Sequence, residues 1–245
     1  MAPDFDDLAA EYAKHRRISP GLIEHILEQA RVTADSAVLE VGCGTAIHLA
    51  AVRRATGARC VGVDPSARML WHAAAHPEEL DLRQGNAEEL DFPAETFDLI
   101  MAIDMLHYVR EPRRYFRRAF TALKPGGLLV TVTDSDWVIR NRIPLSYYFP
   151  ATVDVELGRY HPIPALAGDM ALLGFTELHE RIIESSYLLY EATMFQEKWY
   201  SCLRLIGDEE LAAGIKALKS DLERGPIQAN LRSVALWGRR GRNDR

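Results

Sequence analysis

The stretch VLEVGCGTA, residues 38–46, decides how the rest of the chain is organised. Its three apolar residues, with one acid between them, predict a short buried strand over 38–41. Gly42 and Gly44 then break the strand, and an apolar, helix-compatible run follows over 47–55. Glycine permits positive φ angles and lets a ligand approach the backbone closely. A strand, a glycine turn and a helix N-terminus together predict a place where backbone N–H groups face a ligand.

The composition is that of a soluble globular protein. A length of 245 residues suffices for one large domain or for a domain with a substantial insertion. The net charge of -6 gives no reason to expect a polyanionic partner. Cys43, Cys60 and Cys202 have neither the spacing of metal ligands nor the even number of a disulfide framework. We therefore expect no metal site and a reducing compartment.

Neither a leader nor a membrane span is expected. The first seven residues are acidic and lack the basic-then-apolar order of a signal peptide. No apolar run reaches the roughly 20 residues that a membrane-spanning helix needs. The nearest candidate, residues 99–109, is interrupted by Asp104 and His107. These features predict a cytoplasmic protein without a membrane partner.

Short apolar runs alternate with helical patterns between residues 38 and 133. Strands are expected over 38–41, 59–64, 80–84, 98–104 and 128–133. Helices are expected over 46–56, from Pro65 onward, and over 112–123. This alternation predicts right-handed βαβ units, and hence an α/β fold with a mostly parallel sheet.

The alternation stops at Thr133. Residues 134–164 are rich in aromatic residues, arginine and proline, and the second irregular segment, 186–229, contains helical patterns near 192–206 and 209–223. Between and after them we expect a helix near 165–173 and strands over 178–185 and 233–237. The chain is therefore expected to be one domain, residues 1–245, with insertions at 134–164 and 186–229.

Three polar features follow neighbouring strands at the edge where open parallel sheets bind ligands. They are the glycine turn, Asp64 after the strand 59–64, and Asn86 with Ala87 after the strand 80–84. Asp64 is placed to accept hydrogen bonds from two ribose hydroxyls, and the Asn86 amide to pair with a nucleobase edge. Together they predict a site for an adenosine-like ligand.

A dinucleotide is disfavoured at this site. Its fingerprint requires a third glycine three positions after Gly44, where this chain has Ile47. Glu40, just ahead of the turn, would repel a pyrophosphate. A ligand with an ammonium group and a sulfonium would not be repelled.

Five ordered motifs resemble those of class I S-adenosylmethionine-dependent methyltransferases that modify small molecules, of the methyltransferase type 11 kind. They are VLEVGCGTA at 38–46, VGVD at 61–64, GNAEEL at 85–90, FDLI at 97–100 with LHYV at 106–109, and LKPGG at 123–127. Two positions depart from the family pattern: Ala46 replaces its last glycine, and Asn86 stands where aspartate is commoner. The resemblance covers roughly residues 10–133.

The resemblance implies a Rossmann-like, mostly parallel seven-stranded sheet with helices on both faces. Residues 1–133 would form the cofactor-binding core with N-terminal helices. The segments 134–164 and 186–229 would be helical and aromatic lids over the substrate, after the fifth and sixth strands. The implied cofactor is S-adenosyl-L-methionine, with S-adenosyl-L-homocysteine as product.

The resemblance also implies the cofactor contacts. The glycine turn would pack against the methionine part, Glu40 would lie near its amino group, and Asp64 would hold the ribose. The expected cofactor-binding residues are Tyr12, Arg16, Glu40, Gly42, Cys43, Gly44, Asp64, Ser66, Met69, Asn86, Ala87, Ile103 and Asp104.

Methyl transfer from a sulfonium is an in-line displacement, to which proximity and orientation contribute much. A general base is needed only if the acceptor loses a proton. His107 and His161 are the candidate bases, with a packing role as the alternative for His107 and a surface loop position for His161. The aromatic residues Trp137, Tyr147, Tyr148 and Phe149 are candidates for an acceptor pocket or, equally, for the core of the insertion. Tyr160, next to His161, is a further candidate for acceptor binding.

The expected function is methyl transfer to an oxygen, nitrogen or carbon of a small metabolite. Two alternatives stay open: a nucleic-acid methyltransferase, RNA included, and a non-catalytic protein that binds the cofactor and regulates. The first would use the arginines at 110, 113, 114, 117 and 118. A solvated helix face is the more usual role of such residues, and the acidic net charge makes nucleic acid an unfavoured partner. A homodimer also stays open.

Overall fold

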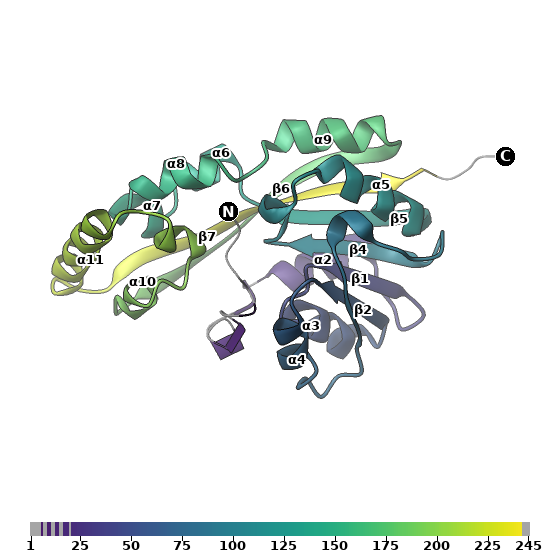
Figure 1. Cartoon of the computed structure of the whole chain (residues 1–245), viewed down its shortest axis with the longest axis horizontal. Coiled ribbons are helices and arrows are strands. Elements are labelled where there is room, and N and C mark those ends of the chain that lie inside the picture. Colours follow the sequence, from purple (N-terminus) through teal and green to yellow (C-terminus); the bar gives the residue numbers. More distant parts are fainter. Residues whose placement is uncertain (1–5, 7–8, 11–12, 15–16, 20, 242–245) are drawn as a thin grey trace. The chain divides into compact units, whose positions relative to one another are not determined.

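The computed structural model describes residues 6, 9–10, 13–14, 17–19 and 21–241. They fall into two compact units, each described separately (Figure 1). Unit 1 takes its described residues from Met1–Thr133, Ile163–Arg181 and Val234–Arg245. Unit 2 comprises Asp134–Pro162 and Ile182–Ser233. Among the helices of this described part, none has both the length and the apolar character that crossing a bilayer requires.

A seven-stranded sheet is built in the order β3-β2-β1-β4-β5-β7-β6. Its strands are β1 (Ala37–Val41), β2 (Arg59–Asp64), β3 (Asp81–Gln84), β4 (Phe97–Ile103), β5 (Leu123–Thr133), β6 (Phe175–Leu189) and β7 (Ile227–Arg240). The first five are mutually parallel, and β7 is antiparallel to β5. The expected Rossmann-like, mostly parallel sheet is therefore confirmed.

The central strands of the sheet are covered on both faces, which explains their nearly continuous apolar sequences. Every residue of β1 is buried, and so is all of β4 except Asp98. On one side of the sheet lie α2 (Leu22–Ala30), α3 (Ile47–Thr56) and α4 (Ala67–Ala73); α5 (Pro112–Ala122) and α9 (Ile163–Leu172) pack together on the other (Figure 1). Two short 3-10 helices, η1 (Ala87–Glu89) and η2 (Leu106–Tyr108), follow β3 and β4.

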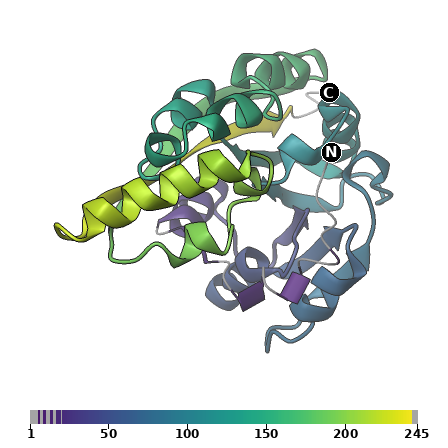
Figure 2. The ribbon, with the colours of Figure 1, turned by 60° about the vertical axis from the view of Figure 1, so that its left-hand side comes forward.

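Unit 2 has its own apolar core. Its helices are α6 (Asp136–Arg140), α7 (Leu145–Tyr148), α8 (Ala151–Leu157), α10 (Thr193–Gln196), η3 (Ser201–Arg204) and the long α11 (Asp208–Leu222), seen in yellow-green in Figure 2. The rings of Phe149 and Phe195 stack in this core with centroids 5.2 Å apart. The unit takes in most of the expected insertions and, in addition, parts of β6 and β7.

The helical pattern near 192–206 does not form one helix. It is divided into α10 and η3, with Lys198 between them at a φ of 53°. A non-glycine residue at positive φ cannot continue a right-handed helix. The sequence-based expectation of a helix across this segment was therefore wrong.

Candidate functional site

The turn after β1 is held by three residues in the left-handed region of backbone conformation. Gly42, Gly44 and Ala46 have φ angles of 69°, 52° and 58°. Glycine adopts such angles without strain, whereas an alanine there costs roughly 1–2 kcal/mol. Ala46 is fully buried and is the N-cap residue of α3. The turn therefore keeps its conformation at this position although no glycine is present.

The amides of the turn bind the neighbouring strand. Val63 O accepts hydrogen bonds from the N–H groups of Gly42 at 2.7 Å and Cys43 at 3.1 Å. Gly44 N–H donates to Asp64 Oδ2 at 2.8 Å. The expectation that the glycine turn directs its N–H groups at a ligand is thus wrong for these three amides, which fix the turn against the end of β2.

Glu40 occupies the N-terminus of α3. Its side chain is 1% exposed; Oε2 accepts from Leu49 N–H at 3.1 Å and Oε1 lies 3.2 Å from His48 Nδ1. A carboxylate is favourable here because the first turn of a helix has unpaired N–H groups and a positive dipole end. The same place would otherwise accept a phosphate. The geometry therefore disfavours a pyrophosphate at α3, while a contact between Glu40 and a ligand's amino group stays a prediction.

Asp64 is buried at the carboxyl end of β2. Oδ2 accepts from Gly44 N–H at 2.8 Å and Oδ1 accepts from Ser66 N–H at 2.9 Å. Burial raises the pKa of this carboxyl, and the two backbone hydrogen bonds oppose that rise. A carboxylate oxygen has two lone pairs, so each oxygen keeps one further acceptor position. Two adjacent acceptor positions suit the paired hydroxyls of a ribose.

Ser66 links Asp6 of the N-terminal segment to the start of α4. Its hydroxyl accepts from Met69 N–H at 3.0 Å and donates to Asp6 Oδ1 at 2.5 Å. Asp6 Oδ1 also accepts from Arg68 N–H at 3.2 Å. Asp6 was not identified from the sequence, because its partners lie about sixty positions away.

Tyr12 and Arg16 of the N-terminal segment, which were expected to contact the cofactor, lie outside the described residues. Met69, by contrast, is described, and it is buried in α4.

The residues expected around an adenine follow β3. Asn86 is exposed and caps η1, since its Oδ1 accepts from Glu88 N–H at 3.0 Å. Ala87 is buried. The Asn86 amide keeps its N–H donors and one oxygen lone pair for a nucleobase, and this contact stays a prediction.

The end of β4 reaches the glycine turn from the other side. Ile103 is buried, and Asp104, at a φ of 53°, donates its N–H to Val132 O at 2.9 Å. Met105 packs against Gly42 so closely that a Cβ on the glycine would lie 2.7 Å from Met105 Cβ. His107 is half-buried in η2, and its ring centroid lies 4.0 Å from that of Tyr108. Met105 was missed from the sequence because its contact depends on the β1–β4 register.

The residues expected at the acceptor belong to unit 2. Trp137 and Tyr147 are exposed, whereas Tyr160 and His161 are half-buried. Tyr148 is buried and donates its hydroxyl proton to Asp221 Oδ2 of α11 at 2.7 Å. This bond and its place in the unit 2 core favour the structural role for Tyr148. The described cofactor candidates thus gather in unit 1, and His107 and His161 belong to different units.

Comparisons with known proteins agree with this geometry. Residues 39–131 match the family model described as a methyltransferase domain. A ubiquinone biosynthesis O-methyltransferase of Bradyrhizobium sp. (strain ORS 278) is 37% identical over 100 residues, which cover 39% of this chain and 39% of that protein. The corresponding protein of Aliivibrio fischeri (strain MJ11) is 33% identical over 132 residues, 52% of this chain and 56% of that protein. The matched segments thus span about two fifths to just over half of these curated relatives.

Solved structures share the fold at low sequence identity. A putative methyltransferase from an antibiotic biosynthesis pathway of Anabaena variabilis ATCC 29413 has a TM-score of 0.70 at 19% identity, covering 89% of this chain and 96% of that chain.

Proposed function

Because the chain belongs to the class I S-adenosylmethionine-dependent methyltransferases, we propose that it transfers a methyl group from S-adenosyl-L-methionine to an oxygen, nitrogen or carbon of a small metabolite. The observation that carries the proposal is the pair of buried acids around the glycine turn. Asp64 offers two acceptor positions at the end of β2, and Glu40 fills the helix N-terminus where a phosphate would bind. This arrangement suits a cationic nucleoside and disfavours a dinucleotide.

The hydrogen-bonding positions left on Asp64 and Asn86 suit this cofactor. Asp64 would hold the ribose hydroxyls, Asn86 and Ala87 the adenine, and Gly42, Cys43 and Gly44 the methionine part. When bound, the cofactor supplies a methyl group made electrophilic by the sulfonium to which it is attached. The chain's task is then to hold the acceptor atom in line with that methyl group, since orientation contributes much to such displacements.

A proton must leave the acceptor if the methylated atom is a hydroxyl oxygen or a protonated amine. His107, in η2 of unit 1, is the first candidate for accepting this proton, and His161 is the second. A replacement of His107 by glutamine should lower kcat for a hydroxyl acceptor about 10²- to 10⁴-fold, with little change in cofactor affinity. Unchanged kcat in this variant would remove His107 from the proposal.

Relatives named ubiquinone biosynthesis O-methyltransferases support an oxygen acceptor as the first to test. Turnover is measured as S-adenosylhomocysteine formed with a panel of small phenols and other metabolites. Turnover of any acceptor would exclude a non-catalytic, regulatory role.

Calorimetry with S-adenosylhomocysteine tests the cofactor directly, with NADH as the rival ligand. Wild type should bind the first and not the second. Asp64→Asn should bind S-adenosylhomocysteine about 10- to 100-fold more weakly, because hydrogen bonds to a charged group contribute roughly 1.5–3 kcal/mol. Asp98→Asn is the matched control: Asp98 also accepts from a backbone N–H, that of Ala37 at 2.8 Å, but lies near the amino end of β4. No binding to wild type would refute the proposal.

Nucleic acid remains a second candidate acceptor because of one surface. The arginines of α5 and its start are all exposed, opposite a buried face that includes Tyr115 and Phe116. They are Arg110, Arg113, Arg114, Arg117 and Arg118. Binding of RNA or DNA at low salt, falling steeply as salt is raised, would support this candidate. Absence of binding at low salt would exclude it.

A further inference from the structure

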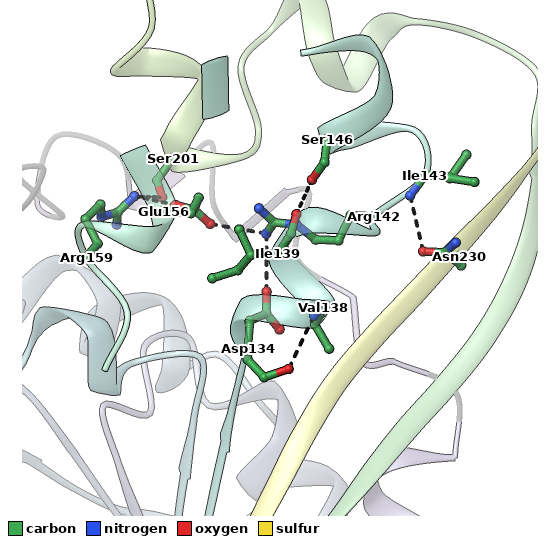
Figure 3. A network of polar contacts seen from close by, with 11 residues as sticks. Asp134, Val138, Ile139, Arg142, Ile143, Ser146, Glu156, Arg159, Ser201 and Asn230 are labelled. Carbon is green, nitrogen blue, oxygen red and sulfur yellow. Dashed lines mark hydrogen bonds and ion pairs between the residues drawn. The ribbon is translucent and has the colours of Figure 1, made fainter. Parts of the chain in front are cut away.

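Unit 2 contains a buried cluster of ion pairs that the proposed function does not use (Figure 3). Arg142 Nη1 lies 3.2 Å from Asp134 Oδ2 and 3.2 Å from Glu156 Oε2. Arg159 Nη1 lies 2.9 Å from Glu156 Oε1 and donates to Ser201 Oγ at 3.2 Å. The cluster therefore joins the segment after β5 to α8 and η3.

Arg142 uses only one edge of its guanidinium in this cluster. Its side chain is 13% exposed, and Nε and Nη2 are buried with no hydrogen-bond partner among the described residues. These two nitrogens form one side of the planar group, the fork that presents parallel N–H donors to an oxygen ligand. More than nine tenths of buried polar groups in proteins are hydrogen-bonded. A buried edge whose two nitrogens have no partner among the described residues therefore indicates an acceptor that these residues do not provide.

The charges around Arg142 restrict what that acceptor is. The ion pairs around Arg142 join two guanidinium groups, of Arg142 and Arg159, to two carboxylates, of Asp134 and Glu156, so the formal charges of these four side chains cancel. Burial alone would lower the pKa of Arg142, but the two carboxylates outweigh it and raise the pKa. A third carboxylate would place an uncompensated negative charge in a largely buried site, which is costly. A carbonyl oxygen supplies lone pairs without charge.

We propose that the Nε–Nη2 edge of Arg142 binds the carbonyl oxygen of an uncharged small molecule. Tyr160, one of the residues expected at the acceptor, lies beside the same cluster, since its backbone N–H donates to Glu156 O at 2.9 Å. We therefore assign this ligand as the methyl acceptor, and this assignment rests on the proposed function. The binding itself rests on unit 2 alone and is testable without the cofactor.

The test uses the full chain labelled with ¹⁵N-arginine, in which the Arg142 Nε–H resonance is assigned by triple-resonance experiments. Benzamide and benzoate are the probes, because they share a shape and differ in charge. Benzamide should shift the Arg142 resonance in a saturable manner, and benzoate should bind at least tenfold more weakly. Tighter binding of benzoate would overturn the assigned chemical class. No shift with either probe would identify a structural arginine satisfied by water.

Variants of Arg142 and Arg140 provide the second part of the test. Arg142→Lys keeps a cation for Asp134 and Glu156 but removes the fork, so benzamide binding should be lost while S-adenosylhomocysteine binding is unchanged. Arg140→Lys, at an exposed position of α6, is the matched control and should behave as wild type. With a methylated acceptor in hand, Arg142→Lys should raise KM more than it lowers kcat. Wild-type benzamide affinity in Arg142→Lys would refute the assignment, whether or not the chain proves to be a methyltransferase.

Discussion

Replacing Gly42 by alanine tests the geometry of the turn after β1. Gly42 has a φ of 69°, and a Cβ built on it would lie 2.7 Å from Met105 Cβ and 2.8 Å from Met105 Cγ. The left-handed conformation costs an alanine roughly 1–2 kcal/mol. Forcing an extra carbon against a packed side chain costs about 1–3 kcal/mol more. Gly42→Ala should therefore lower the free energy of unfolding by about 2–5 kcal/mol.

Gly57→Ala separates the cost of the left-handed backbone conformation from the steric cost of the added Cβ. Gly57 has a φ of 72°, but a Cβ added to it would lie 3.6 Å from its nearest neighbour, Ala34 Cβ, which is an ordinary contact. This control should show only the conformational cost. Urea denaturation followed by circular dichroism measures both variants, and calorimetry measures their affinity for S-adenosylhomocysteine. Gly42→Ala should also weaken that affinity, because relief of the contact moves the turn, whereas Gly57→Ala should not.

A double-mutant cycle with Met105→Ala completes the experiment. If the Met105 side chain causes the steric part of the cost, Gly42→Ala should lower the free energy of unfolding by about 1–3 kcal/mol less in the Met105→Ala background than in wild type. Equal costs for Gly42→Ala and Gly57→Ala, or no coupling between Gly42→Ala and Met105→Ala, would refute the reasoning.

Three further predictions follow from burial and charge. Glu156→Gln should lower the free energy of unfolding by about 3 kcal/mol, because it removes the charged partner of two largely buried arginines, Arg142 and Arg159. Glu184→Gln is the control: the Glu184 side chain is 49% exposed, so this change should cost less than about 1 kcal/mol in the same denaturation experiment. All three cysteines are buried, and burial raises the pKa of each thiol, that of Cys60 and Cys202 to about 12. The native chain should therefore resist alkylation at pH 8 and react with three equivalents in denaturant; rapid native modification would contradict this burial. Burial also raises the pKa of Asp64 above its ordinary 3.8, so its ionised form disfavours folding at neutral pH, and this cost is relieved as the pH falls. Protonation removes the charged acceptor, so affinity for S-adenosylhomocysteine should fall as the pH is lowered from 7 in wild type but stay flat in Asp64→Asn; a flat wild-type profile would count against the assigned role of Asp64.

Local sequence patterns determined the sheet because its central strands are buried on both faces. The expected strand 59–64 coincides with β2, and the strand 38–41 differs from β1 by one residue. Such strands are recognisable as short apolar runs that end in glycine or an acid. The place of Asp64 at the carboxyl end of β2 follows from the same pattern, because parallel strands bring their carboxyl ends to one edge of the sheet.

The partners of the site residues were decided only by the tertiary structure. Glu40 binds α3, the turn amides bind the end of β2, and Met105 packs on Gly42. Each contact depends on the register between strands or on where a helix begins relative to the sheet. Neither can be read from the residues adjacent to the contact in the sequence.

Contacts between residues far apart in the sequence were likewise decided only by the tertiary structure. Asp6 meets Ser66 across 60 positions, and Arg142 obtains its two carboxylates from segments on either side of it. For the parallel strands β1 and β2, the sequence by itself thus determined which elements form and which acid lies at the end of β2. Folding decided which hydrogen-bonding positions of those side chains are already used by the chain and which remain for a ligand, because that depends on atoms brought together from distant parts of the sequence.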